Sequence, residues 1–427
     1  MKKNLFYALF FTKALMLSFV HRALAQLIPA NYDEAVVPAY TLPDPLLTLN
    51  GKKIGTSKDW ETQRRPEILQ LFSENVYGKM PTKVVKTNFE TTRSDANALG
   101  GLATRQEITI SFPDSPNAPK IYVLVYLPNT TTAPVAAFLG LNFCGNQCIA
   151  NDPAIRLSSS YGPDFCKGFV KNLATEAART SQEERWPLEM VVKQGFAVVT
   201  AHYGDLEPDF AEGWKTGIRG TMAQQLGVQP QEWSAIGAWA WGLSRIMDLL
   251  QKTPAINAQR VALMGHSRLG KAALWAGATD TRFGMVISND SGEGGAALAK
   301  REFGETTAHI NTSFPHWFVD KFKTYNKNSA ALPVDQHLLL SLIAPRPLYV
   351  ASAEEDRWAD PKGEFLAARE AAPVYAIYGK KGVGVTEMPP VNRPVGQTVR
   401  YHIRTGGHDI NRYDWEQYVA FAQEVWK

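Results

Sequence analysis

The sequence predicts an α/β fold of three layers, in which helices cover both faces of a mostly parallel central sheet. Continuous apolar runs at residues 135–141 and 195–201 are typical of strands that are buried on both faces. A strongly apolar helix is expected over 233–250, and strands follow it at 260–265 and 285–288. Strands that alternate with helices in this way pair in parallel, and functional side chains then gather at the carboxyl ends of the strands.

The remaining elements of the amino-terminal half follow from local patterns. Residues 26 to about 102 are rich in proline and irregular, with one amphipathic helix near 65–77. Alternating strands at 105–112 and 120–127 flank a Pro-Asp-Ser-Pro-Asn segment and predict an antiparallel hairpin. The stretch at 142–194 is polar and contains Gly and Pro. We expect it to be a long inserted loop region, because long insertions at strand ends are usually functional.

The amino-terminal residues have the pattern of a secretory signal peptide. Lysines precede an apolar run at 5–20, and an Ala-Leu-Ala cleavage pattern ends at Ala25. We therefore predict a signal peptide at 1–25 and a single α/β domain at 26–427, with Gln26 as the first mature residue. No later segment is long and apolar enough to cross a bilayer, so we expect export to the periplasm or to the outside.

Charge and cysteine content argue against several classes of partner. The formal net charge of +4 is mild and the basic residues are spread along the chain, so we expect no nucleic acid and no membrane partner. Cys144, Cys148 and Cys166 predict one disulfide and one free thiol in an exported protein, with the pairing open. No histidine lies near these cysteines, which disfavours a zinc site. We predict a monomer with no metal and no cofactor.

A glycine-flanked serine marks the centre of the chemistry. The apolar run from Val261 ends in Gly265-His266-Ser267, and the chain then becomes helical. This pattern is typical of a nucleophile elbow, which projects a serine hydroxyl from the carboxyl end of a strand. The spacing is G-x-S-x-x-G, with Leu269 where the usual second glycine would stand. The alternative is an ordinary turn in which Ser267 caps the helix.

An acid and a histidine follow the serine in the required order. Asp356 comes directly after an apolar, β-prone run at 346–353. His408 follows an alternating strand at 398–404 and two glycines. The order Ser, acid, His predicts a serine hydrolase with the α/β-hydrolase fold. The alternatives are that Asp356 caps the next helix and that His408 is a surface loop residue.

Several segments together resemble one family. Residues 265–271 are similar to the G-C-S-R-x-G-K elbow of the glucuronoyl esterases, carbohydrate esterase family fifteen, with His266 in place of the cysteine common in fungal members. Further matches lie at residues 140–143, 291–292, 304–305, 332–337 and 343–346, and at Trp358 and His408. The resemblance covers most of the mature chain, which is identified as a bacterial-type member on these motifs.

The resemblance implies a reaction and several residue roles. It implies hydrolysis of the ester between 4-O-methyl-glucuronic acid of glucuronoxylan and lignin alcohols, so the expected partner is this lignin–carbohydrate ester. Ser267 would be the nucleophile and His408 the base. Arg268 would help to form the oxyanion hole. The positions that bind the sugar in the family are occupied by Lys271, Glu305 and Trp358.

The position of the triad acid stays open. The glutamate of fungal members matches Asp290, whereas Asp356 has the usual α/β-hydrolase position. We favour Asp356 and expect that both carboxylates can contact His408. Two other roles have structural alternatives: Arg268 could form an ion pair with a nearby carboxylate, and Trp358 could be a core aromatic.

Three other functions remain in competition with this interpretation. The same residues could serve an acetyl-xylan or other carbohydrate esterase. A secreted peptidase would use the same triad. A non-catalytic binding protein with the same fold is the third alternative, and the presence of Ser267, His408 and two candidate acids argues against it.

Overall fold

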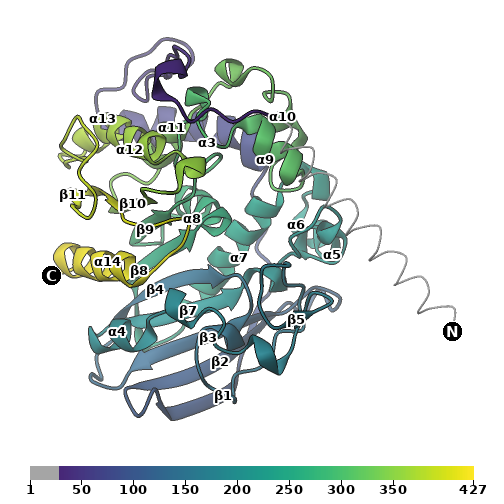
Figure 1. Cartoon of the computed structure of the whole chain (residues 1–427). Helices are drawn as coiled ribbons and strands as arrows, with labels where there is room; N and C mark the ends of the chain where they lie inside the picture. The colour runs from purple at the N-terminus through teal and green to yellow at the C-terminus, as the bar shows by residue number, and fades with distance from the viewer. Residues whose placement is uncertain (1–27) are drawn as a thin grey trace, which may run out of the picture.

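The computed structural model describes residues 28–427, so the predicted signal peptide and its cleavage site lie outside the described residues. A ten-stranded sheet runs through the molecule in the order β1-β2-β3-β7-β4-β8-β9-β10-β12-β11 (Figure 1). Its strands are β1 Asn88–Ala98, β2 Ala103–Ser111, β3 Ile121–Pro128, β4 Val135–Asn142, β7 Ala197–His202, β8 Ile256–His266, β9 Met285–Asn289, β10 Leu348–Ala353, β11 Val395–Gly396 and β12 Val399–Arg404.

The centre of the sheet is parallel, as predicted. Six consecutive strands pair in parallel with one another, in the order β7, β4, β8, β9, β10 and β12. Antiparallel strands lie at both edges: β1, β2 and β3 form a meander that joins β7, and β11 pairs with β12. The predicted hairpin is β2 and β3, and it is confirmed within two residues at each end.

Helices cover both faces of the sheet and complete three layers. The α-helices are α2 Ser57–Asp59, α3 Arg65–Phe72, α4 Leu188–Lys193, α5 Ile218–Thr221, α6 Ala223–Leu226, α7 Ala235–Leu250, α8 Arg268–Thr279, α9 Thr307–Ser313, α10 Asp320–Lys323, α11 Gln336–Ser341, α12 Pro361–Glu370, α13 Ala372–Ala376 and α14 Arg412–Val425. In β8, Leu263 belongs to the core cluster that contains α7, α8 and α11 residues, whereas Met264 belongs to the cluster with α4 and α14. Successive side chains of a strand point to opposite faces, so each central strand is buried on both sides.

One prediction for the amino-terminal part was wrong. Residues 88–98 form the edge strand β1 rather than irregular chain. Its sequence is mostly polar and exposed, so it carries no alternating apolar pattern. The strand forms because its backbone pairs with β2, an interaction that single-strand periodicity cannot predict. In the part of the chain that is described, no helix is long and apolar enough to cross a membrane.

The segment at 142–194 contains short elements and one covalent link. A two-stranded hairpin, β5 Phe169–Val170 and β6 Leu173–Ala174, stands apart from the main sheet. Cys144 and Cys166 form a disulfide, and Cys148 is a buried free thiol. The expected combination of one disulfide and one thiol is therefore confirmed, and the pairing that the sequence left open is resolved.

Candidate active site

The strand–turn–helix of the elbow is present at the carboxyl end of β8. Ser267 lies between β8 and α8 with φ 56° and ψ −128°, a conformation that is strained for a residue with a side chain. A Cβ on Gly265 would come to 2.0 Å from the carbonyl oxygen of Leu269, so the turn requires glycine at this position. A Cβ on Gly270 would approach Ser291 to 2.9 Å, which explains why the second glycine stands one residue later. The Ser267 side chain does not cap α8, so the capping alternative is wrong.

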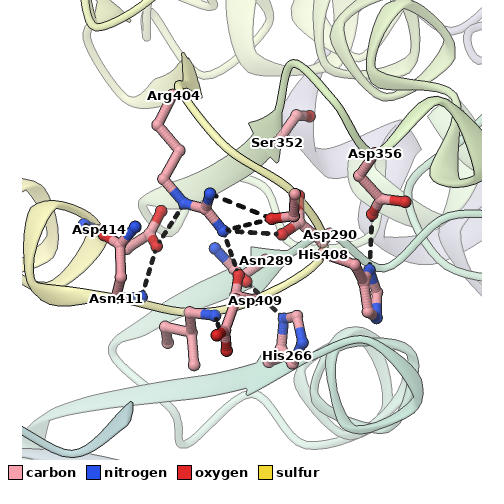
Figure 2. A network of polar contacts seen from close by, with 12 residues as sticks. His266, Asn289, Asp290, Ser352, Asp356, Arg404, His408, Asp409, Asn411 and Asp414 are labelled. Atoms are coloured by element: carbon pink, nitrogen blue, oxygen red, sulfur yellow. Dashed lines mark hydrogen bonds and ion pairs between the residues drawn. The ribbon is translucent and has the colours of Figure 1, made fainter. Parts of the chain in front are cut away.

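The candidate acid and base meet at the ends of neighbouring strands. Asp356 follows β10 and His408 follows β12, and these two strands are parallel partners. The Asp356 Oδ2 atom lies 2.6 Å from Nδ1 of His408 (Figure 2). A carboxylate on Nδ1 leaves Nε2 as the nitrogen that can accept a proton. Asp356 makes no side-chain cap to the 3-10 helix that follows it, so that alternative is also wrong.

Asp290 has a different environment. It follows β9, is 1% exposed, and places Oδ2 at 3.3 Å from the Arg404 guanidinium. Its Oδ1 is buried and has no hydrogen-bond partner among the described residues. Burial, with Glu364 and Asp356 nearby, holds the pKa of Asp290 well above its usual range. Asp356, and not Asp290, is hydrogen-bonded to His408 in the described part of the chain.

These groups also form a possible set of metal ligands. One atom each from Asp290, Asp356 and His408 lie within 4.8 Å of one another. However, Asp290 is in contact with the positive charge of Arg404. A cation at this place would be repelled by that guanidinium, so the arrangement fits an acid–base pair better than a metal site.

Arg404 fastens the loop that carries His408, a role that sequence reasoning missed. Its Nε donates to Asp414 Oδ2 at 2.8 Å. Its terminal nitrogens donate to the carbonyl oxygens of Gly407 and Asp409, the two residues that flank His408 (Figure 2). In the sequence, Arg404 is the last residue of an alternating strand, and no motif distinguishes it from a solvent-exposed arginine.

Arg268, the first residue of α8, forms the ion pair that the sequence left as an alternative. Its guanidinium lies 2.5 Å from Asp209 and 4.6 Å from the ring centre of Trp317. Burial would raise the pKa of Asp209, but Arg268 and His316 outweigh it and hold the pKa below the usual range. The Arg268 Nε is buried and has no hydrogen-bond partner among the described residues. The ion pair therefore fixes the guanidinium, and the buried Nε donor stays without a partner among the described residues.

The three candidate sugar-binding residues lie on different elements. Lys271 is buried in α8, and its ammonium donates to the Ser291 carbonyl oxygen at 2.5 Å. Burial raises the pKa of Glu305, and the charge of Lys271 opposes this shift, so the two side chains interact. The backbone N–H of Glu305 donates to the backbone carbonyl oxygen of Trp358 at 2.8 Å. Trp358 is 40% exposed, so the core-aromatic alternative is wrong.

Glu293, in the loop after β9, makes stability depend on pH. It is buried and accepts a hydrogen bond from Thr307, and burial raises its pKa from 4.5 to about 8. Between these values the folded state binds a proton that the unfolded state has lost, so the free energy of unfolding falls as pH rises. We expect Glu293→Gln to reduce the fall in Tm between about pH 5 and about pH 8. The exposed control Glu90→Gln should leave the fall unchanged, and an undiminished fall in Glu293→Gln would contradict the assignment.

The fold and the site define a class. A ten-stranded, mostly parallel sheet that carries a serine elbow and an acid–histidine pair at its strand ends is the architecture of the α/β-hydrolases. The family description "Glucuronyl esterase, fungi" matches residues 187–379. A carbohydrate esterase of an unknown prokaryotic organism is 46% identical over 395 residues, which cover 92% of this chain and 91% of that protein.

Solved structures agree with the sequence match. The glucuronoyl esterase from Solibacter usitatus is 49% identical with a TM-score of 0.87, over 92% of this chain and all of that chain. A promiscuous esterase of carbohydrate esterase family fifteen from a marine bacterial metagenome is 44% identical with a TM-score of 0.87, over 92% of this chain and 99% of that chain. The chain therefore belongs to the glucuronoyl esterase family, carbohydrate esterase family fifteen, and it is a carboxylic ester hydrolase.

Proposed function

We propose that this enzyme hydrolyses esters between 4-O-methyl-glucuronic acid of glucuronoxylan and lignin alcohols, through an acyl-enzyme on Ser267. The single observation that carries the proposal is the 2.6 Å bond between Asp356 and His408, beside the elbow of Ser267, in a chain of this family. A carboxylate so placed orients the imidazole and stabilises the imidazolium that forms when the serine is deprotonated.

The reaction proceeds in two halves. His408 takes the proton of Ser267 while Oγ attacks the ester carbonyl, and a tetrahedral intermediate forms. The C–O bond to the alcohol then breaks, and His408 returns the proton to the departing oxygen. Water, activated by His408 in the same way, attacks the acyl-enzyme and releases the uronic acid together with the free serine.

Arg268 stabilises the oxyanion. Asp209 and the ring of Trp317 hold its guanidinium at the start of α8, next to Ser267. A donor that is fixed before the reaction does not have to reorganise when charge develops on the carbonyl oxygen. The positive end of α8 adds to the same field. The buried Nε without a partner supports this role, because it is a donor that the free enzyme does not use.

We expect Arg268→Ala to lower kcat by roughly 10²–10³-fold with little change in KM, because the ester carbonyl is neutral until it is attacked. Arg268→Lys should restore little of the lost kcat, since the point charge of lysine on a flexible side chain does not reproduce the planar guanidinium group. Steady-state kinetics on a benzyl glucuronate ester give both constants. A raised KM with unchanged kcat would instead make Arg268 a ground-state binding residue.

Lys271, Glu305 and Trp358 bind the uronic acid ring. An ammonium and a carboxyl group suit the hydroxyls of a sugar, and the exposed indole of Trp358 offers a stacking face. The substrate then lies between Trp358 and the elbow. The enzyme is proposed to act as a monomer, outside the cell or in the periplasm.

A substrate comparison tests the proposal. We expect kcat/KM for benzyl glucuronate ester to exceed that for acetylated xylo-oligosaccharides by at least about tenfold, roughly one good polar contact in the transition state. Acetyl esters are the second candidate, because one relative of this chain is described as a promiscuous esterase. Equal or higher activity on the acetyl ester would overturn the preference for glucuronate. Cleavage of a peptide amide at a similar rate would indicate a peptidase.

A further inference from the structure

The residue before the elbow serine packs against the proposed base. His266 is the last residue of β8, is 5% exposed, and presents its ring to His408 with the centres 4.6 Å apart and the planes inclined by 42°. The ring of Phe143 also lies near it, with the ring centres 6.0 Å apart. The ring of His266 therefore has two aromatic neighbours, His408 and Phe143.

A buried relay sets the orientation of His266. Its Nδ1 lies 2.6 Å from Asn289 Oδ1, and the amide nitrogen of Asn289 donates to the Tyr418 hydroxyl at 2.9 Å. With the amide in this orientation Oδ1 can only accept, so Nδ1 of His266 carries the hydrogen. Figure 2 shows Asn289 above His266, with the Asp356–His408 pair to their right.

The charges around His266 oppose a second proton. His408, Arg185 and Arg404 lie near it, and each is positive when protonated. Arg185 is paired with Asp409, and Arg404 with Asp414 and Asp290. Burial, with these neighbours, holds the pKa of His266 well below its usual range. His408 itself faces Asp356, with Asp290 and Glu305 also nearby.

We propose that His266 is a positioning residue whose ring packs against His408 and supports it against Asp356, beside the imidazolium that forms during catalysis. A neutral π face attracts a cation, whereas a second imidazolium at this distance would repel it. The proposal rests on the proposed function, since it takes His408 as the base. His266 does not touch the ester and transfers no proton.

Two substitutions separate ring support from a merely structural role. His266→Ala removes the ring and should lower kcat roughly tenfold with KM within about twofold, the size of one aromatic contact. His266→Phe supplies a neutral ring that cannot titrate and should restore kcat to within about threefold of wild type. The acid limb of the kcat/KM profile should have the same midpoint in wild type and His266→Phe, because the pKa of His266 is held well below its usual range.

The Asp356–His408 bond provides a spectroscopic check. The downfield proton resonance of His408 Nδ1–H should be present in wild type and His266→Phe, and broadened in His266→Ala. His266→Ala and His266→Phe both leave Asn289 with an unsatisfied acceptor and should lose stability. All assays are therefore run well below the Tm of the less stable variant. His337→Ala is the matched control: this buried histidine contacts the Pro43 carbonyl oxygen, and its loss should lower Tm without changing kcat.

The outcomes are distinct. Three results would each overturn the inference. They are an unchanged kcat in His266→Ala, an equal loss of kcat in His266→Ala and His266→Phe, and a shifted acid limb of the kcat/KM profile in His266→Phe. His408→Ala is measured in parallel. If it retains activity, the proposed function fails. If it is inactive while the His266 variants behave as wild type, only the role of His266 fails.

Discussion

Ser267→Ala is expected to lower kcat on a glucuronate ester by about 10⁶-fold, since this is the loss on removing the nucleophile of a triad. The effect is this large because no other group can form the acyl-enzyme that divides the reaction into two easier steps. Ser267 is held at φ 56° by the fold of the elbow, and its side chain does not cap α8, so alanine should leave the structure intact.

The control for Ser267→Ala is stability. Its Tm should lie within a few degrees of wild type, because about 1 kcal/mol or less separates the two side chains at a partly exposed site. Retention of more than a few per cent of the wild-type kcat by a folded variant would show that another residue is the nucleophile.

Asp356→Asn is expected to lower kcat by about 10⁴-fold, because an amide at this place stabilises the wrong tautomer of the histidine. The 2.6 Å contact with His408 Nδ1 makes Asp356 the group that fixes the tautomer. The change is isosteric, so binding of the ester should be largely retained. Steady-state kcat and KM check both expectations.

Asp290→Asn is the matched comparison. Burial and the neighbouring carboxylates hold the pKa of Asp290 well above its usual range, and an amide keeps the size and shape of its side chain. We expect kcat of Asp290→Asn to fall by less than about tenfold, since no hydrogen bond to His408 is removed. A large loss of kcat in Asp290→Asn, together with an unchanged kcat in Asp356→Asn, would make Asp290 the triad acid.

Much of the site could be predicted because strand ends are visible in sequence. Strand patterns that end shortly before Ser267, Asp356 and His408 show where three strands end, and parallel strands bring those ends to one edge. The buried parallel strands were found for the same reason. The choice between Asp290 and Asp356 could not be made from sequence, since both follow strands. It depends on which side chain reaches Nδ1 of His408.

The residues that hold Arg268 and His408 in place could not be predicted from the sequence. Asp209 holds Arg268 across 59 residues of sequence. Arg404 fastens the His408 loop, which is close to it in sequence, but no local motif marks its role. In the sequence His266 is only a departure from the fungal elbow, because its contact with His408 depends on how the end of β8 meets the loop after β12. The edge strand β1 was missed because its pairing with β2 compensates for a polar sequence.

The most direct test of the central claim is a rapid acid quench during the first turnover of a benzyl glucuronate ester, followed by peptide mapping. We predict a glucuronoyl ester on the peptide that contains Ser267, formed with a matching release of benzyl alcohol. Ser267→Ala should show neither the adduct nor the release. An adduct on a peptide that lacks Ser267, or alcohol release by Ser267→Ala at the wild-type rate, would contradict the account.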